Sequence, residues 1–372
     1  MIIYNSMIIW IVVLGIWNSL VMQARQKTYR MQQKNTENKV PLYLAILTFG
    51  YIIFWVGMRS GVADTIAYIS MFENYSTSLT AIPQYWNFVE NKSPGFDTLN
   101  ILFKHFISQD YHVWLMTIAI ITGIPIMLTL RKFSKHFFYS MFLFMTGLLF
   151  TWMFNGMRQF LVVAIVFMMS DWIVKKKTIL FMIVILLLST IHFTALIMIP
   201  MYFIVTAEPF GKKTILFLGS LLLAILFLDP FVSTVENLLS ETAYGGATAQ
   251  FVQDDGVNII RVMVMLVTPM IAFLGRKIIK QKKDRFLDVC VNMSVVCAGI
   301  YILGMFTSGI LVGRLPVYFE IYNLILLPYL LKECFTKSSS RLMFVLCTIG
   351  FLGFYWLQMR GWYYISDIIG IS

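Results

Sequence analysis

The chain has 372 residues, of which 59% are hydrophobic, 16% aromatic and 13% charged. Its mean hydropathy of +0.78 implies more apolar surface than a soluble core can bury, which excludes an ordinary soluble domain and favours an integral membrane protein. The net charge of +11 comes mostly from short segments between apolar runs, which is typical of membrane topology rather than of nucleic-acid binding.

The apolar runs predict membrane-spanning helices, because they are too long for β-barrel strands and lack two-residue alternation. We predict one all-α, polytopic membrane domain over residues 1–372, with about 12 transmembrane helices. The first run has no basic leader or cleavage site and is expected to be a retained helix. The expected crossings are residues 1–22, 41–57, 111–130, 137–154, 160–174, 214–228, 259–275, 286–306, 315–331 and 342–357, with two short crossings between 178 and 211.

Those two crossings are predicted from length. Residues 178–211 lie between two basic segments that are expected on the same side. As one helix they would be about 51 Å long, whereas two crossings of the hydrocarbon core need roughly 60 Å. We therefore expect two short or broken helices with a turn near residues 189–192, and Pro200 disturbing the second. The turn would place His192 in a protein-lined recess below the outer membrane surface.

The distribution of basic residues predicts which loops face the cytoplasm and which face outward. By the positive-inside rule the basic loops are cytoplasmic, which makes residues 58–110 and 229–258 two larger extracytoplasmic loops and puts both termini outside. The remaining seven lysines and arginines would then lie outside: Arg59, Lys92, Lys104, Arg158, Arg261, Arg314 and Arg360. Most are arginines, whose planar and always charged side chain suits a phosphate.

The segment 155–159 is the first candidate site. It places Asn155, Arg158 and Gln159 between two apolar runs, and an ionisable residue at such a junction by default indicates function. The alternative is an interfacial arginine that reaches lipid headgroups. Arg314 occupies a similar position before Tyr318, and its alternative is a structural ion pair with Glu320.

The segment 59–72 is the second candidate site. If a helix starts after Asp64, then Asp64, Tyr68 and Phe72 share one face, with Arg59 leading in. That face could present a carboxylate, a phenol and an aromatic plane. The alternative is an interfacial helix with Asp64 as a simple cap and its aromatics in the membrane belt.

Residues 92–100 and His192 each have a structural and a functional interpretation. Residues 92–100 are predicted to form a turn that enters a helix, with Asp97 in its first turn. His192 is the one histidine with wholly apolar expected surroundings, and inside a membrane recess such a residue is a candidate for function rather than only a satisfied core group.

The sequence contains no motif that is typical of a metal site or of a nucleotide-binding site. The four cysteines, Cys290, Cys297, Cys334 and Cys347, have no CxxC spacing, and no His/Cys/carboxylate cluster has ligand spacing. There is also no Walker loop, GxGxxG, GxSxG or DxD pair, which disfavours a nucleotide-sugar or ATP substrate. We expect no metal and no cofactor.

The ordered landmarks of this chain resemble the EpsG family, which is grouped with the Wzy polysaccharide polymerases. The resemblance extends from about Arg59 to Phe319, and Ser93 departs from it, because many relatives carry an acid before the Pro-Gly. The landmarks are Arg59, Asp64, Tyr68 and Phe72, then Pro94-Gly95-Phe96 with Leu99-Asn100, then Asn155, Arg158 and Gln159, then residues 191–196 (IHFTAL), and Arg314 with Tyr318-Phe319.

The resemblance implies a GT-C-like helical fold and a glycosyltransferase of exopolysaccharide or capsule biosynthesis. Its substrate, as donor and acceptor, would be an oligosaccharide repeat unit on undecaprenyl diphosphate, polymerised on the outer face of the bacterial plasma membrane with inversion and without metal. Besides membrane lipids, a chain-length regulator and a flippase are expected partners, and nucleic acid is not.

The chemistry of that reaction assigns expected roles. Arginines stabilise a departing diphosphate, and a histidine or carboxylate can accept the proton of the attacking hydroxyl. We expect His192, Asp64 and Arg158 to be catalytic, and the substrate-binding residues to be Arg59, Tyr68, Asn155, Gln159, Arg314 and Tyr318. The alternatives are an O-antigen-type ligase or another lipid-linked-sugar glycosyltransferase, and, more distantly, a transporter or flippase of an anionic lipid.

Overall fold

The computed structural model describes residues 1–28, 39–87, 91–228, 230, 233–234, 237 and 255–371. Within these ranges the chain is helical, and its one strand-like pairing is a bridge between Ser366 and Ile371. Four helices are long and apolar enough to cross a membrane: α1 (Ile2–Thr28), α5 (Tyr111–Phe133), α16 (Arg285–Phe306) and α19 (Lys337–Gln358). The predicted all-helical, multi-pass membrane protein is therefore confirmed.

The number of twelve spans is not confirmed. In the described part of the chain the four long helices become five if α14 (Ile259–Leu274) and α15 (Arg276–Lys282), bent by 67°, are counted as one span. Most other expected crossings are short or broken. They are α2 (Leu42–Gly57), α6 (Phe137–Thr146) with η2 (Leu149–Met153), α7 (Met157–Met168) with α8 (Ser170–Val174), α11 (Lys212–Leu226), and η5 (Val312–Arg314) with α17 (Val317–Glu320) and α18 (Asn323–Glu333).

The expected break after residue 189 is present. Helix α9 (Thr178–Ser189) ends in a turn, and the chain returns as η3 (Phe193–Ile197) and α10 (Met198–Val205), with η3 packed against α9. The prediction of two short helices joined near residues 189–192 is therefore confirmed. Pro200 lies inside α10, which is only eight residues long.

The break between α6 and η2 was not expected. Here Leu148 has a left-handed backbone with φ +70°, which no continuous right-handed helix can contain. Because Leu148 is 3% exposed, burial among the surrounding helices holds this strained conformation in place. Hydropathy identified the apolar run of residues 137–154 but could not reveal this local reversal.

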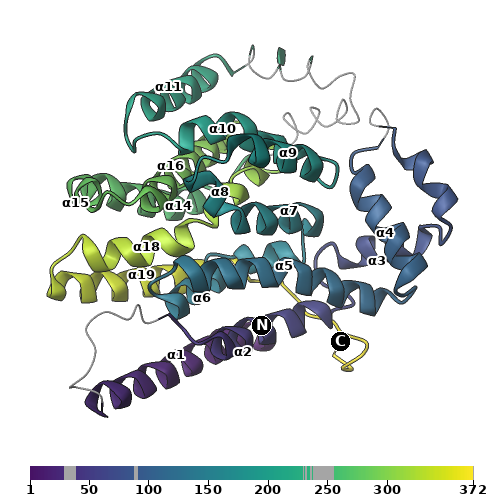
Figure 1. Ribbon diagram of the computed structural model, residues 1–372, viewed down its shortest axis with the longest axis horizontal. Coiled ribbons are helices and arrows are strands. Elements are labelled where there is room, and N and C mark those ends of the chain that lie inside the picture. Colours follow the sequence, from purple (N-terminus) through teal and green to yellow (C-terminus); the bar gives the residue numbers. More distant parts are fainter. Residues whose placement is uncertain are drawn as a thin grey trace.

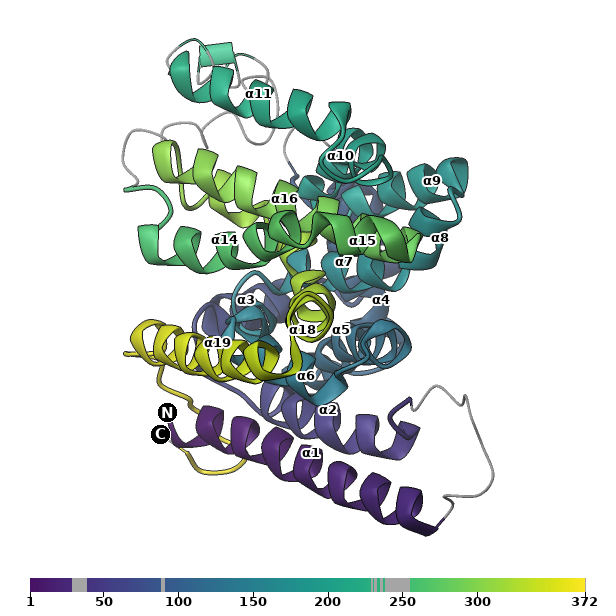
Figure 2. The ribbon, with the colours of Figure 1, turned by 90° about the vertical axis from the view of Figure 1, so that its left-hand side faces the viewer.

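Helices α16 and α18 lie in the centre of the bundle, with α7 beside them, while α1 and α11 lie at opposite edges (Figures 1 and 2). Backbone carbonyls in this interior bind polar side chains. Ser140 of α6 donates to the Leu324 carbonyl at 2.6 Å, and Asn292 of α16 donates to the Ala207 carbonyl at 2.8 Å. Such bonds satisfy the carbonyls left open at helix ends and breaks inside an apolar bundle.

Residues 58–87 and 91–110 form a folded cap at one end of the bundle, opposite the end that carries α15 (Figures 1 and 2). The cap consists of α3 (Thr65–Asn74), η1 (Leu79–Tyr85) and α4 (Pro94–Phe106). Lys104 of α4 donates to the carbonyls of Phe72, Glu73 and Tyr75 at 3.1, 2.9 and 2.7 Å. It thereby caps α3 and fixes the two helices together. Most of the other predicted loop, 229–258, lies outside the described residues.

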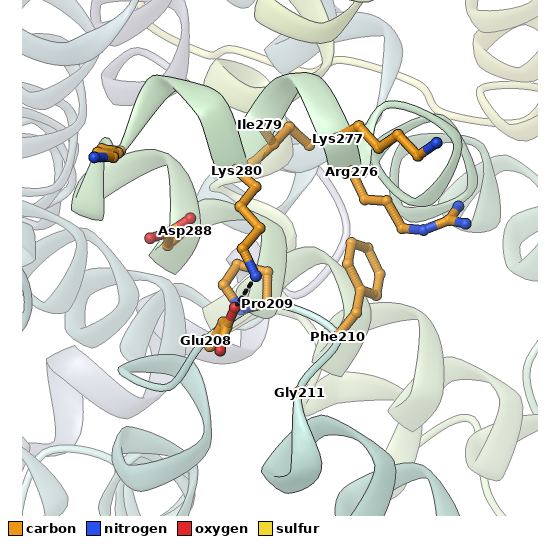
Figure 3. A pocket seen from close by; sticks show the side chains of 10 residues that line it. Glu208, Pro209, Phe210, Gly211, Arg276, Lys277, Ile279, Lys280 and Asp288 are labelled. Carbon is orange, nitrogen blue, oxygen red and sulfur yellow. Dashed lines mark hydrogen bonds and ion pairs between the residues drawn. The ribbon is translucent and has the colours of Figure 1, made fainter.

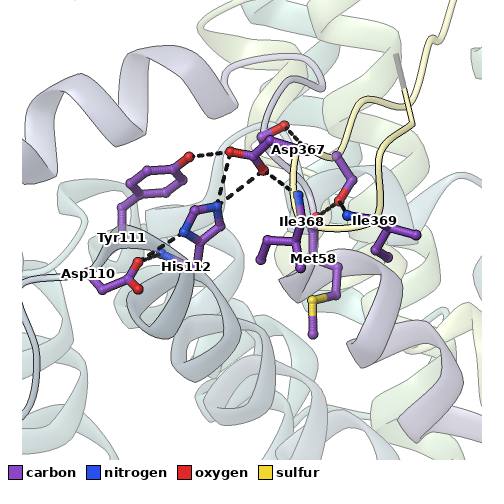
Figure 4. Close-up of polar contacts among 9 residues, drawn as sticks. Met58, Asp110, Tyr111, His112, Asp367, Ile368 and Ile369 are labelled. Carbon is purple, nitrogen blue, oxygen red and sulfur yellow. Dashed lines mark hydrogen bonds and ion pairs between the residues drawn. The ribbon is translucent and has the colours of Figure 1, made fainter.

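The C-terminal segment returns to this same end and packs against the start of the cap. The Ile365 carbonyl accepts from Ser60 N at 2.9 Å, and Ser366 Oγ donates to the Met58 carbonyl at 2.5 Å. Figure 4 shows the Asp367 carboxylate hydrogen-bonded to both Tyr111 and His112 at the start of α5. The sequence contained no signal for this contact.

Candidate functional site

The start of α7 positions Arg158. Before it, Gly156 has φ +76°, and a Cβ at Gly156 would lie 2.9 Å from the Trp152 ring, so a side chain there would be both strained and crowded. Arg158 thus lies in the first turn of α7. Its Nη1 donates to Ser93 Oγ at 2.6 Å, its guanidinium lies 5.9 Å from the Phe96 ring centroid, and its Nε is buried without a hydrogen-bond partner.

The start of α4 is docked on the turn that follows α9. Gly95 N donates to the Thr190 carbonyl at 2.9 Å, and a Cβ on Gly95 would approach Thr190 Oγ1 to 2.2 Å and its carbonyl carbon to 3.0 Å. Only glycine permits this approach of the two backbones. The contact brings Ser93, and with it Arg158, to the turn that carries His192.

His192 is part of a chain of polar groups. Its Nδ1 lies 2.7 Å from Thr194 Oγ1, which lies 3.1 Å from the hydroxyl of Tyr318. The imidazole is half-buried, and the guanidinium groups of Arg158 and Arg314 are close enough to act on it electrostatically. Since Nδ1 is engaged, Nε2 is the ring nitrogen that remains for a ligand.

Arg314 reaches the site from η5. Its carbonyl accepts from Gln159 Nε2 at 3.0 Å, which joins the η5 turn to α7. The alternative ion pair between Arg314 and Glu320 is not formed, because Glu320 accepts a hydrogen bond from Tyr301 at 2.5 Å instead. The Arg314 side chain is half-buried.

Arg59 does not lie at an open surface. Its side chain is 0% exposed. The guanidinium donates to the Val56 carbonyl and to Thr65 Oγ1 at 3.0 Å, and its Nη2 lies 3.2 Å from Met157 Sδ. All of these partners are protein atoms, so the structure gives Arg59 the role of a tie between the cap and α7.

Helix α3 begins as expected after Asp64, but the three residues expected on one of its faces differ in burial. Asp64 is half-buried and makes no side-chain capping bond, whereas Tyr68 is 8% and Phe72 0% exposed. Phe72 stacks on Trp114 with ring centroids 4.6 Å apart. Phe72 is therefore a core residue and presents no aromatic plane to a ligand.

The expected site residues thus fall into two adjacent groups. The first joins α7, η5, α17 and the α9–η3 turn through Arg158, Gln159, His192, Arg314 and Tyr318. Asn155, half-buried, precedes α7 in the same turn. The second group, Arg59, Asp64 and Tyr68, lies at the start of the cap and packs on the first through Met157.

Three residues near the site received no role from the sequence. Ser93 holds Arg158, and Thr194 holds His192. Asp97, expected only in a helix turn, is 6% exposed and is bonded by Tyr75 and by Asn91 at 2.7 Å. No local signal in the sequence predicted the bond between Ser93 and Arg158, because the two residues lie 65 positions apart along the chain.

Among the residues that the structure describes, no three His, Cys, Asp or Glu side chains are grouped so that they could hold a metal ion.

The fold and this buried polar cluster define an all-helical, multi-pass membrane protein with arginine and histidine side chains gathered at one end. The model of the EpsG family matches residues 42–366, and the chain belongs to that family, whose members are similar to Wzy-type polysaccharide polymerases. Neither a curated protein nor a solved structure matches the chain. Membership indicates a role in polysaccharide biosynthesis at a membrane.

Proposed function

We propose that this protein is a polymerase that joins oligosaccharide repeat units carried on undecaprenyl diphosphate into exopolysaccharide or capsular polysaccharide. The observation that carries the proposal is that the elements holding Arg158, Arg314 and His192 are joined by hydrogen bonds, from Gln159 to the Arg314 carbonyl and between Thr194 and Tyr318. Two guanidinium groups and an imidazole are suited to a reaction in which a diphosphate leaves and a hydroxyl loses a proton.

Arg158 and Arg314 stabilise the departing diphosphate. The leaving group gains negative charge as the glycosidic bond to the donor sugar breaks, and preorganised cations in a water-poor site favour that state. Ser93 occupies only one nitrogen of Arg158, while its Nε has no protein partner. An unpaired donor on a buried cation costs free energy, and a bound phosphate oxygen would remove that cost.

His192 is the general base. With its proton on Nδ1, the imidazole donates to Thr194 and keeps a lone pair on Nε2 for the hydroxyl of the acceptor sugar. The hydroxyl oxygen forms a bond to the anomeric carbon from the face opposite the diphosphate, which inverts that centre and requires no metal. Thr194 and Tyr318 are positioning residues for the ring.

The remaining candidate residues have supporting roles. Arg59, bonded only to protein atoms, positions Met157 and the start of α7. Asp64 is the second candidate base. Tyr68 at the start of the cap and Asn155 in the turn before α7 are candidates for sugar contacts. Gln159 holds the Arg314 backbone.

The orientation follows from charge. Helix α15, with the sequence RKIIKQK, lies at the end opposite the cap (Figure 1), and basic loops favour the cytoplasmic side of the plasma membrane. The cap and the Arg158 site would then face outward. With the short and broken helices also counted as crossings, the proposed architecture is a GT-C-like fold of about twelve spans.

Replacement of Arg158 tests the proposal. In cells, Arg158→Ala should abolish high-molecular-weight polymer while membrane insertion is retained. The matched control is Arg360→Ala, which removes an exposed arginine outside the site and should leave polymer unchanged. Wild-type polymer from Arg158→Ala would refute the role. A single transferred unit instead of a ladder from the wild-type protein would indicate a ligase.

A further inference from the structure

A second polar site lies at the opposite end of the bundle. A cavity of about 630 Å³ opens between α15 and the turn that connects α10 to α11. Its lining includes Glu208, Phe210, Arg276, Lys277, Lys280 and Lys283 (Figure 3). None of these residues belongs to the Arg158 site, so the cavity needs a separate explanation.

The bend at Gly275 creates this cavity. Helix α15 turns by 67° from α14, and a Cβ at Gly275 would come within 2.4 Å of Cys334 Sγ, so the bend is packed too closely for a side chain. Ile279 is 3% exposed, whereas the basic residues around it are exposed. A short helix with one apolar anchor and basic flanks, turned away from its span, is suited to the membrane–water interface.

Phe210 and four cations line the cavity. Phe210 packs edge-on against Phe273, with ring centroids 5.3 Å apart. The Arg276 guanidinium lies 4.4 Å from the same Phe273 ring centroid and donates to the Phe273 carbonyl at 3.0 Å. These contacts hold Arg276 in one orientation, which lowers the entropic cost of binding an anion.

The charge balance favours an anion. Four cations line the cavity with two acids, Glu208 and Asp288. Glu208 is already paired with Lys280 at 2.9 Å (Figure 3). An adjoining cavity of about 150 Å³ shares both acids and adds Lys176 and Arg285.

We propose that this cavity binds the phosphate headgroup of an anionic phospholipid. The exposed apolar side chains of Phe273 and Leu274, 49% and 75% exposed on α14, lie beside Arg276 and would contact the acyl chains. A free phosphate would use the cations but not this apolar surface. Basic pockets between helices at a membrane surface are suited to such headgroups. The site does not depend on the proposed polymerase activity.

Native mass spectrometry of the purified full chain tests the site. Phosphatidylglycerol should stay bound in preference to phosphatidylcholine. The double variant Arg276→Gln/Lys277→Gln should weaken its binding by about 25-fold, because each neutralised charge near a membrane surface costs about fivefold. The control Lys337→Gln/Arg341→Gln removes two exposed charges outside the cavity and should change little.

Three results would overturn the proposal: equal retention of the two lipids, equal loss in both double variants, or inorganic phosphate that displaces phosphatidylglycerol at similar concentration. The last would identify a free phosphate as the ligand. Circular dichroism of both variants verifies folding. Should Arg276→Gln/Lys277→Gln not fold, high salt applied to the wild-type protein should release phosphatidylglycerol selectively, and salt-independent retention would also contradict the site.

Discussion

Arg158 and Ser93 are joined by a 2.6 Å hydrogen bond between Nη1 and Oγ, which connects the first turn of α7 to the residue that precedes α4. Ser93 is 3% exposed, so water does not compete for this bond. It orients the Arg158 guanidinium, whose buried Nε has no hydrogen-bond partner.

Removal of the Ser93 hydroxyl should weaken catalysis without abolishing it. Ser93→Ala leaves Nη1 of Arg158 without its partner. Since a hydrogen bond to a charged group stabilises by an amount that corresponds to about tenfold, we expect the rate of polymerisation to fall by about tenfold. Ser93→Thr, which keeps a hydroxyl, should restore most of the activity. Equal activities of Ser93→Ala and wild type in a polymer assay would remove Ser93 from the site.

The shape of the Arg158 side chain should matter as well as its charge. Arg158→Lys keeps the charge but loses the planar, bidentate fork, and we expect a rate reduction of about 100-fold, the size of effect that loss of a preorganised donor produces. Repeat-unit turnover by purified protein measures it. Full activity in Arg158→Lys would mean that charge alone suffices.

Thr194 should act through His192. Thr194→Val removes the partner of Nδ1, so the imidazole can adopt the wrong tautomer or rotate. We expect kcat to fall by about tenfold with KM little changed, because a general base contributes roughly 10²–10⁴-fold in total. Thr194→Ser should rescue kcat. A change in KM alone, or failure of serine to rescue, would favour a purely structural role.

The contact between Gly95 and Thr190 should be sensitive to one methyl group. Gly95→Ala places a Cβ 3.0 Å from the Thr190 carbonyl carbon, and such overpacking costs about 1–3 kcal/mol of the free energy of unfolding. Polymer yield should fall too, because Ser93 would move. Gly50→Ala in α2, where a Cβ meets nothing within 4 Å, is the matched control. Identical thermal stability of the two variants would contradict the close approach.

The contact of the C-terminal segment with the start of α5, made through Asp367, should depend on pH. A hydrogen bond from Tyr111, with a smaller contribution from His112, lowers the pKa of Asp367 to about 2 (Figure 4). A lowered pKa means that the carboxylate stabilises tail docking above its ordinary pKa and loses this effect as pH falls toward 2. The effect is small, because Asp367 is half-exposed.

Protease cleavage within residues 360–371 measures this docking. Asp367→Asn should accelerate cleavage at neutral pH, and its difference from wild type should shrink as pH approaches 2. Asp255→Asn, at an exposed carboxylate, serves as the control. A difference that persists at pH 2, or that is absent at pH 7, would contradict the role of the carboxylate.

Hydropathy and length predicted much of the helical framework. The limits of α2, α5 and α16 agree with the expected runs to within a few residues, because a continuous apolar stretch must be helical in a membrane. The break near His192 followed from span length. The reversal at Leu148 and the bend at Gly275 did not, because each depends on packing against distant elements.

The candidate site could be predicted only as separate pieces. Arg158, Arg314 and His192 stood out because ionisable groups in apolar runs are unusual. The sequence could not show that Thr65 and Met157 would enclose the Arg59 guanidinium. Docking of the C-terminal segment on the cap had no local signal, since its partners Ser60 and His112 lie far away along the chain.

Purified protein in lipid nanodiscs, supplied with the undecaprenyl-diphosphate-linked repeat unit as its only substrate, provides the most direct measurement. We predict a ladder of repeat multiples with release of undecaprenyl diphosphate, formed in the presence of a metal chelator and lost in Arg158→Ala but not in Arg360→Ala. Absence of any product from correctly folded wild-type protein would contradict the assignment of this site to polymer synthesis. An undiminished ladder from Arg158→Ala would contradict it too.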